Sequence, residues 1–296
     1  MKAQNLTISI PCEGKCDKNC EYCISKMTGY LKPDLYMMRR NLPKVRNLLE
    51  RADAAFVLFT GKKEPLLNFE VLLEFANYFK DYPIEIQTNG LRLNKHREWI
   101  HFLEGAGVDV FAFSIDDIRQ MERYRLMFKA IADVNLTTRI CLNLTNKIST
   151  NVNFEEIFSI CKSYPVQQLL VRNIMIPDKI VNTEESHRAA QWIKSNVDPV
   201  RYYEMYMEFL RLSGIAYAGS GYGTLDKILA DVDNRRTHLV RKLPHGALVW
   251  DHEDIAVSFS DYCIQEANNT EDIRSLILQD TGHVDTSWDK KASRLF

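Results

Sequence analysis

Short apolar runs alternate with helical patterns through the first two-thirds of this chain, and the alternation limits the folds that it can adopt. AFVLFTG (residues 55–61) is a continuous apolar run ended by Gly, as in a strand buried on both faces. Residues 68–82 then have the apolar spacing of a helix, and IEIQTNG (residues 84–90) has the composition of the next strand. About six such units, each of about 30 residues, predict an α/β fold in which helices cover a parallel sheet, either open or curled into a partial barrel. In both cases we expect a ligand to bind at the carboxyl ends of the strands.

The later part of the chain loses this regularity. We therefore divide the chain into a β/α part at residues 1–197, a helix with a Gly-rich connection at residues 198–245, and a small β-rich segment at residues 246–296. Within the last segment we expect two pairs of strands, one around a polar turn in residues 247–264 and one around residues 280–282.

Charge and hydropathy narrow the class of protein. The 296 residues include 38 basic and 39 acidic side chains, a formal net charge of -1, so extended nucleic acid is not a predicted partner. The basic run at residues 235–242 leaves a local contact with a phosphate open. No apolar stretch approaches the ~20 residues of a membrane span, and residues 1–16 lack the pattern of a signal peptide. We expect a cytoplasmic protein with reduced thiols and no membrane partner.

Four of the seven cysteines, Cys12, Cys16, Cys20 and Cys23, crowd into one short stretch, which predicts a metal site rather than a disulfide framework. Structural zinc usually takes two separated ligand pairs, and no second pair follows at a suitable distance. A closed four-cysteine iron–sulfur centre is possible. Alternatively, Cys16, Cys20 and Cys23 could bind three irons of a [4Fe–4S] cluster and leave the fourth iron open to a small molecule.

The segment CDKNCEYC (residues 16–23) directly follows the first expected strand and resembles the motif C-x3-C-x-φ-C of the radical S-adenosylmethionine (radical SAM) enzymes, where φ is aromatic. The resemblance implies that Cys16, Cys20 and Cys23 hold a [4Fe–4S] cluster, that SAM chelates its open iron, and that Tyr22 lies against the adenine. One electron would then cleave SAM to a 5′-deoxyadenosyl radical, which abstracts hydrogen from a substrate. Cys12 would be a bystander under the loop.

The resemblance also implies a fold, a partial (β/α)6 TIM-like barrel whose open side is covered by the β-rich C-terminal segment. It extends over about the first 175 residues, and the layout is similar to the branch that contains the molybdopterin-precursor cyclase, the deazaguanine-forming synthase and viperin. A single cluster is expected, because Cys263 is the only cysteine after Cys161 and one thiol cannot hold a second cluster.

Other motifs support the same family. GKKEP (residues 61–65) resembles the GGEP motif but is one residue longer. The resemblance implies that the Gly61 backbone approaches the SAM amino group and that Glu64 fixes the turn, whereas an ordinary strand–helix turn is the alternative. At the end of the third strand, the resemblance suggests that Thr88 and Asn89 face the SAM or substrate pocket, although Asn-Gly alone is a common turn.

The fourth, fifth and sixth expected strands carry the remaining candidates. The resemblance gives Ser114 and Asp116 the ribose hydroxyls, although Asp116 could simply cap the next helix. Polar side chains within the next two strands are candidates for the SAM carboxylate, adenine or an anionic substrate: Arg139, Asn143, Arg172 and Asn173. The alternative is that the two arginines form salt bridges on the outer side. In related enzymes a residue near Met175 contacts the adenine through its backbone.

Together these observations predict a single-cluster radical SAM enzyme that acts on a small-molecule or nucleotide substrate. It would take its electron from an external one-electron reductant such as a flavodoxin or ferredoxin. Two alternatives are radical SAM modification of a peptide or nucleic-acid base, with salt-sensitive binding of the polymer, and a non-catalytic iron–sulfur or zinc protein.

Overall fold

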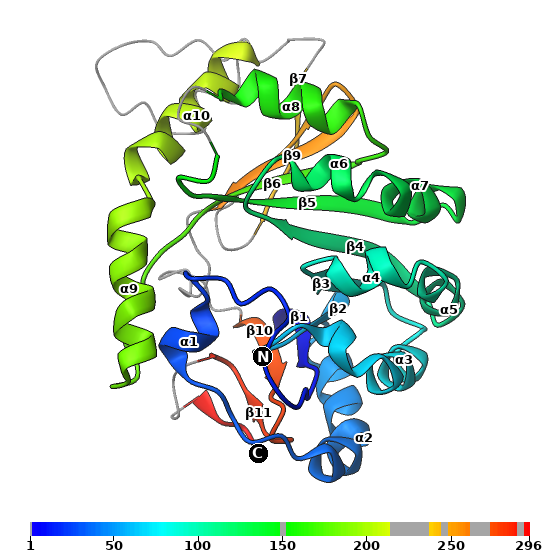
Figure 1. Ribbon diagram of the computed structural model, residues 1–296. Helices are drawn as coiled ribbons and strands as arrows, with labels where there is room; N and C mark the ends of the chain where they lie inside the picture. Colours follow the sequence, from blue (N-terminus) through cyan, green and yellow to red (C-terminus); the bar gives the residue numbers. More distant parts are fainter. Residues whose placement is uncertain (1, 149–151, 214–236, 244–247, 261–272, 289–292) are drawn as a thin grey trace.

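A computed structural model describes residues 2–148, 152–213, 237–243, 248–260, 273–288 and 293–296. These residues form one 11-stranded sheet in the order β11-β10-β1-β2-β3-β4-β5-β6-β9-β8-β7 (Figure 1). The strands are β1 (Ala3–Ser9), β2 (Phe56–Thr60), β3 (Ile84–Thr88), β4 (Val108–Ile115), β5 (Thr137–Leu144), β6 (Gln168–Asn173), β7 (Thr237–Lys242), β8 (Leu248–His252), β9 (Ile255–Ser260), β10 (Ile273–Leu278) and β11 (Val284–Asp285).

Strands β1 to β6 pair in chain order, and every pair is parallel. This confirms the α/β fold with a parallel sheet that the alternation predicts. The expected partial TIM-like barrel is not confirmed, because the sheet is open and ends in β11 on one side and β7 on the other. Closing a barrel requires its two edge strands to pair with each other. Here C-terminal strands pair with β1 and β6 instead.

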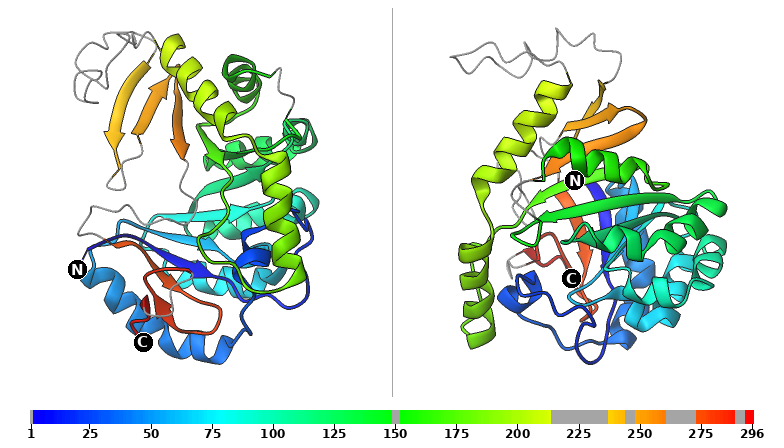
Figure 2. Two further views of the ribbon diagram at one scale, coloured as in Figure 1. Left: turned by 90° about the vertical axis from the view of Figure 1, so that its left-hand side faces the viewer. Right: turned by 45° about the horizontal axis from the view of Figure 1, so that its top comes forward.

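Helices follow most of the central strands, and their caps agree with the sequence pattern, as in the capping boxes at Asn153 and Thr183. They are α1 (Ile24–Thr28), α2 (Leu35–Arg51), the 3-10 helix η1 (Pro65–Asn68), α3 (Phe69–Tyr78), α4 (Leu91–Lys95), α5 (Trp99–Gly105), α6 (Gln120–Arg123), α7 (Arg125–Asp133), α8 (Phe154–Lys162), α9 (Glu184–Asn196) and α10 (Pro199–Leu212). Helices α3, α5 and α7 lie together on one side, whereas α9 lies beside α1 on the other (Figures 1 and 2). Within the described part of the chain, no helix is both long and apolar enough to cross a membrane.

The C-terminal strands complete the sheet at both edges. The two expected strand pairs form: β8 and β9 flank a turn at Glu253 and Asp254, and β10 is followed by antiparallel β11. They do not make a separate layer, because β9 pairs with β6 and β10 pairs with β1, both in parallel. Unpaired backbone groups at the edges of β1 and β6 are satisfied in this way. The domain boundaries at 197 and 245 stay predictions, and residues 214–236 of the Gly-rich connection lie outside the described residues.

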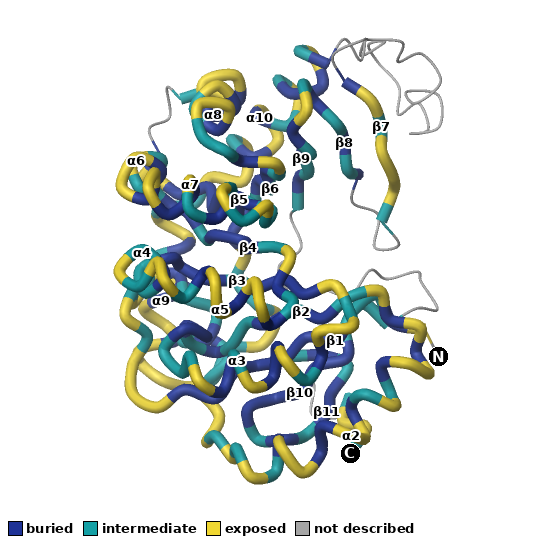
Figure 3. Tube along the Cα trace, turned by 90° about the vertical axis from the view of Figure 1, so that its right-hand side faces the viewer, coloured by how far each residue is buried: buried dark blue, intermediate teal, exposed yellow. Residues whose placement is uncertain are grey.

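The two faces of the central sheet differ in polarity. On the helix-covered face, Phe113 of β4 packs against Phe128 of α7 with ring centroids 5.3 Å apart, and Ile140 of β5 is fully buried. Because side chains alternate along a strand, Arg139 and Asn143 of β5 point to the opposite face. Figure 3 shows the central strands buried beneath partly exposed helices. These polar side chains of β5 therefore lie on the face of the sheet opposite the helices.

The turn between β10 and β11 tests how the C-terminal strands dock on α2. At Gly282 φ is +83°, and an added Cβ would lie 2.6 Å from the Cβ of Met37. Asn41 of α2 also donates to the Gly282 carbonyl at 2.8 Å. We expect Gly282→Ala to lower the free energy of unfolding by about 1–3 kcal/mol, measured by urea denaturation with circular dichroism. The control Gly105→Ala adds a Cβ with nothing within 4 Å, so it should not be destabilising. Equal losses in both variants would contradict this docking.

Candidate functional site

The cysteine loop, residues 10–23, connects β1 to α1 at the edge where the parallel strands end. Gly14 and Asn19 adopt φ of +69° and +49°, left-handed conformations that a tight loop needs. Cys16, Cys20 and Cys23 are partly exposed and carry free thiols. Burial raises the pKa of Cys20 to about 11 and also raises the pKa of Cys16, although backbone N–H groups of Lys18 and Asn19 act to lower the latter.

The loop offers three thiols as metal ligands. Among the described residues, no three His, Cys, Asp or Glu side chains gather closely enough to hold one metal ion. A cubane iron–sulfur cluster takes one thiolate at each of three corners, so its ligands lie further apart than those of a single ion. Three free thiols match the donor set of an open [4Fe–4S] cluster in number and type, whereas a closed zinc site needs four ligands.

Cys12 differs from these three cysteines in its burial and contacts. It is 3% exposed, and its thiol donates to the carbonyls of Glu64 and Ile10 at 3.2 and 3.4 Å. Burial, together with the nearby Glu64 carboxylate, raises the pKa of the Cys12 thiol to about 12. A buried thiol that already bonds two carbonyls has a structural role under the loop.

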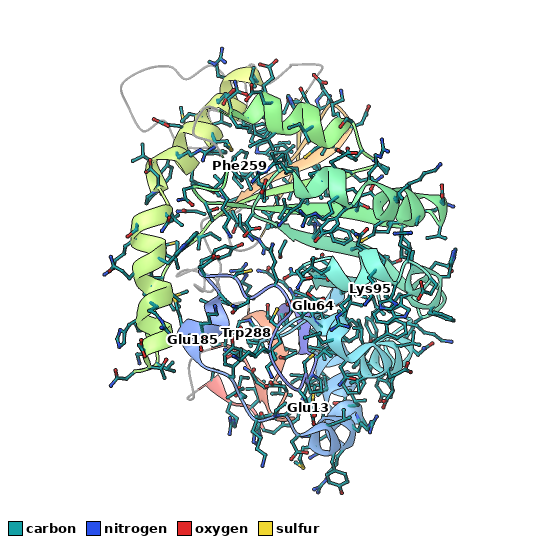
Figure 4. All side chains as sticks on the ribbon, in the orientation of Figure 1. Glu13, Glu64, Lys95, Glu185, Phe259 and Trp288 are labelled. Atoms are coloured by element: carbon teal, nitrogen blue, oxygen red, sulfur yellow. The ribbon has the colours of Figure 1, made fainter. Side chains whose placement is uncertain are left out.

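Glu64 joins the ends of β2 and β3. Its carboxylate accepts from the Thr88 hydroxyl at 2.6 Å, the Asn89 backbone N–H at 2.8 Å and the Leu66 backbone N–H at 3.2 Å. Burial raises the pKa of Glu64 to about 7, against the lowering effect of these hydrogen bonds. Figure 4 shows Glu64 near the centre of the molecule, among the strand ends. Thr88 therefore lies against Glu64. It is buried, and its hydroxyl also accepts from the Gly90 N–H at 3.0 Å.

The GKKEP segment places two lysines against the cysteine loop and α1. An added Cβ at Gly61 would lie 3.3 Å from the carbonyl oxygens of Ile10 and Lys63, so this position is crowded by backbone. Lys62 donates to Thr28 of α1 at 2.7 Å, and Lys63 donates to the Cys12 carbonyl at 2.7 Å. Lys62 and Lys63 therefore occupy the position that the GGEP motif gives to a second glycine, and their side chains bond α1 and the cysteine loop.

Asn89, at the end of β3, reaches the loop itself. Its amide nitrogen donates to the Asp17 carboxylate at 2.8 Å and lies 3.9 Å from the Cys16 sulfur. Its carbonyl oxygen accepts from the Leu91 N–H at 2.9 Å, which starts α4. Arg92 adds an ion pair to Asp17 at 3.2 Å. The expectation that Asn89 faces the site is therefore compatible with its position beside Cys16.

Asp116, which follows β4, is 1% exposed and surrounded by donors from the loop. Lys18 lies 2.9 Å from one oxygen, and the Tyr22 hydroxyl donates to the other at 2.9 Å. Burial alone would raise the pKa of Asp116, but the ammonium group of Lys18, helped by Tyr22 and Lys147, holds it below its ordinary value. Ser114, the other side chain expected to contact ribose, differs from Asp116 because its hydroxyl has no hydrogen-bond partner in the described part of the chain. Its backbone carbonyl accepts from Lys18 at 3.0 Å.

The candidates on β5 and β6 lie at different depths. Arg139 forms an ion pair with Glu85 of β3 and donates to Gln168 at 2.6 Å. Arg139 lies on the inner face of the sheet, the face opposite helices α3, α5 and α7. It is four residues, or about 13 Å, from Asn143, so it is far from the carboxyl ends of the strands. Asn143 does reach the loop, because its amide lies 3.4 Å from the Tyr22 hydroxyl.

Arg172 is the neighbour of Asn143 in the β5–β6 register. Met175, just beyond β6, is 38% exposed.

A second apolar cluster covers the loop from the side of α9, and the sequence did not predict it. Tyr22 and Met27 pack there against Ile193, and the Tyr22 and Trp192 rings lie 5.5 Å apart. Lys147 lies 5.9 Å from the Trp192 ring centroid. Lys18 and Lys147 are functional candidates that sequence reasoning missed, although the place of Lys18 between two cysteines was a usable signal.

Comparison with known proteins agrees with this geometry. The sequence profile described as the radical SAM superfamily matches residues 11–171, more than half of the chain. An uncharacterized protein of Methanocaldococcus jannaschii is 31% identical over 121 residues, which cover 40% of this chain and 37% of that protein. The chain therefore matches well under two-thirds of this relative's length.

Two solved structures are also similar. Streptococcus suis SuiB bound to precursor peptide SuiA shares 15% identity at a TM-score of 0.45, covering 73% of this chain and 53% of SuiB. SuiB bound to S-adenosylmethionine shares 16% identity at a TM-score of 0.42, covering 66% of this chain and 47% of SuiB. These scores are too low for SuiB to inform the chemistry of this chain. The profile match, together with the three thiols at the carboxyl edge of a parallel sheet, shows that the chain belongs to the radical SAM superfamily, and this membership indicates an enzyme.

Proposed function

We propose that the protein binds a [4Fe–4S] cluster through Cys16, Cys20 and Cys23 and cleaves S-adenosylmethionine reductively. The observation that carries the proposal is the set of three free thiols at family spacing on a loop at the carboxyl edge of the sheet. When bound, the cluster would supply the electron that releases a 5′-deoxyadenosyl radical, which takes hydrogen from a small-molecule or nucleotide substrate. The electron would come from an external donor such as a flavodoxin or ferredoxin.

The chain itself would position SAM between the loop and the strand ends. Tyr22 is held by its hydroxyl and packs beside Trp192, so its ring offers a fixed wall for the adenine. The backbone at Gly61, where neighbouring carbonyls leave little room for a Cβ, would approach the amino group of SAM. Glu64, three residues later, fixes this turn through its hydrogen bond with the Asn89 N–H. Ser114, whose hydroxyl has no partner within the described residues, is a better ribose ligand than Asp116, whose oxygens are already occupied.

The apolar cluster around α9 would keep bulk water from this side of the loop. Ala189, Ala190 and Ile193 of α9 are buried against Met27 of α1. Lys26 and Glu185 also approach to 4.0 Å across the two helices. A reactive radical needs a site that excludes competing hydrogen donors, and a packed helix beside the loop supplies such a wall.

The polar inner face of the sheet is where we place the substrate. Arg139, 26% exposed at its side chain, is oriented by Glu85 and Gln168 and presents a planar donor group toward this face. Arg172, one strand further, is a second candidate for an anionic or polar substrate. Salt-sensitive, saturable binding of a peptide or nucleic acid would instead favour a polymer substrate.

Cysteine variants separate the ligands from the bystander. After anaerobic reconstitution, we expect Cys16→Ala, Cys20→Ala and Cys23→Ala each to lose cluster iron and to abolish formation of 5′-deoxyadenosine from SAM under dithionite. The matched control Cys12→Ala should retain both, because that thiol bonds only backbone carbonyls. Iron and sulfide content and chromatography of 5′-deoxyadenosine are the measurements. A colourless reconstituted protein, or one that makes no 5′-deoxyadenosine, would point to the non-catalytic alternative.

Glu64 makes a prediction about pH, because it holds two strand ends beneath the proposed SAM site. Its pKa in the folded protein is about 7, against an ordinary value of 4.5, so between these values the folded state binds a proton that the unfolded state has lost. The contribution of this group to stability is complete below pH 4.5 and is lost as pH rises through about 7, a change of about 3 kcal/mol.

Urea unfolding across this pH range measures the effect. Glu64→Gln should flatten the fall in stability between pH 4.5 and 7. Glu70→Gln, at an exposed position of α3, should keep the wild-type slope. An unchanged slope in Glu64→Gln would show that another group is responsible.

A further inference from the structure

We propose that Asp116 is a positioning residue that holds the cysteine loop against the end of β4, rather than a ligand of SAM. One buried carboxylate binds a side chain in each of the two intervals between the three cysteines: Lys18 between Cys16 and Cys20, and Tyr22 between Cys20 and Cys23. The inference rests on the proposed function only in taking this loop as the cluster site.

Both oxygens of Asp116 are saturated by the protein. Oδ1 lies 2.9 Å from Lys18 Nζ and accepts from Gln120 Nε2 at 3.1 Å. Oδ2 accepts from the Tyr22 hydroxyl at 2.9 Å and from Lys147 Nζ at 3.4 Å. An ionised carboxylate has about four acceptor positions, and four donors occupy them here. A ribose hydroxyl could bind only by displacing one of these donors.

The same contacts reach the loop from two strand ends. Lys18 also donates to the Ser114 carbonyl at 3.0 Å, which is a second contact between β4 and the segment from Cys16 to Cys20. Lys147, which follows β5, bridges Asp116 to Glu21 of the loop at 3.1 Å. Three loop residues, Lys18, Glu21 and Tyr22, are therefore tied to β4 and β5 through one network.

Burial makes this network strong and sensitive to substitution. The side chains of Asp116 and Lys18 are 2% and 13% exposed, so solvent screens their attraction weakly. Removing one member of a buried charge pair leaves the other uncompensated, and hydrogen bonds to charged groups are stronger than neutral ones. Asp116→Asn should therefore release both intervals of the loop at once.

Alkylation of the cluster-free, reduced protein tests this directly. With iodoacetamide at several pH values and peptide mass spectrometry, we expect Asp116→Asn to raise the alkylation rates of Cys16 and Cys20 by about tenfold or more, because local opening becomes easier. The rates are compared per thiolate, since loss of the Asp116 charge by itself lowers the pKa of the Cys20 thiol. The matched control Asp117→Asn removes a neighbouring carboxylate whose one ion pair among the described residues is with the exposed Arg119, and it should leave both rates unchanged.

The fully buried thiol of Cys161, in α8, is an internal reference for global unfolding. In the proposed role Cys16 and Cys20 react faster than Cys161 in Asp116→Asn, because the loop opens without the rest of the fold.

A double variant separates this role from general destabilisation. Lys18→Met alone should loosen the first interval, and combined with Asp116→Asn it should add less than it does alone, because the ion pair is already lost and only the contact with the Ser114 carbonyl remains. Should Asp116→Asn fold poorly, Tyr22→Phe keeps the carboxylate and removes only the hydroxyl contacts to Asp116 and Asn143, and it should speed the alkylation of Cys20 by a smaller factor.

Two outcomes would overturn the proposal. One is an unchanged rate at Cys16 and Cys20 together with weaker SAM binding to reconstituted Asp116→Asn by equilibrium dialysis, since that pattern belongs to a ribose ligand. The other is alkylation of Cys16 and Cys20 at the same absolute rate as Cys161 in Asp116→Asn, which would mean that the loop reacts only through unfolding of the whole protein. Because alkylation uses protein without a cluster, its result stands apart from any failure to cleave SAM.

Discussion

Parallel pairing of β1 to β6 is the constraint on which the site depends. Parallel strands end at the same edge, so the residues that follow them converge although they are far apart in sequence. The cysteine loop follows β1, Glu64 follows β2, Asn89 follows β3 and Asp116 follows β4. No local preference of these segments would bring them together. The sheet does so because each strand runs in the same direction and is paired with its neighbour in chain order.

Two buried carboxylates then hold the edge together by opposite means. Glu64 is satisfied by neutral donors, and its burial raises its pKa to about 7. Asp116 is equally buried but faces the ammonium groups of Lys18 and Lys147, which keep its pKa below the ordinary value. The first joins two strand ends to each other. Asp116 joins the end of β4 to the cysteine loop, and it keeps its negative charge there, so the contact includes an ion pair with Lys18.

Particular residues show how far sequence reasoning reached. Cys12 was set apart from the other three cysteines, and its thiol contacts backbone carbonyls, while Glu64 lies at the turn that follows β2. Arg139 was a candidate for a ligand contact, or for a salt bridge on the outer side of the sheet, and it forms its ion pair with Glu85 on the inner face. The difference arises because the position of a polar residue along a strand is visible in the sequence, whereas the partner two strands away depends on register.

The sequence by itself determined the period of strands and helices, the C-x3-C-x2-C spacing and the family, because hydrophobic periodicity and motif spacing are local properties. The tertiary structure decided that the sheet is open, since β9 and β10 compete for the edges that barrel closure would use. It also decided which side chains hold the cysteine loop. Lys18 and Asp116 are nearly a hundred positions apart, and only the packed sheet brings them within 2.9 Å, where burial makes their attraction count.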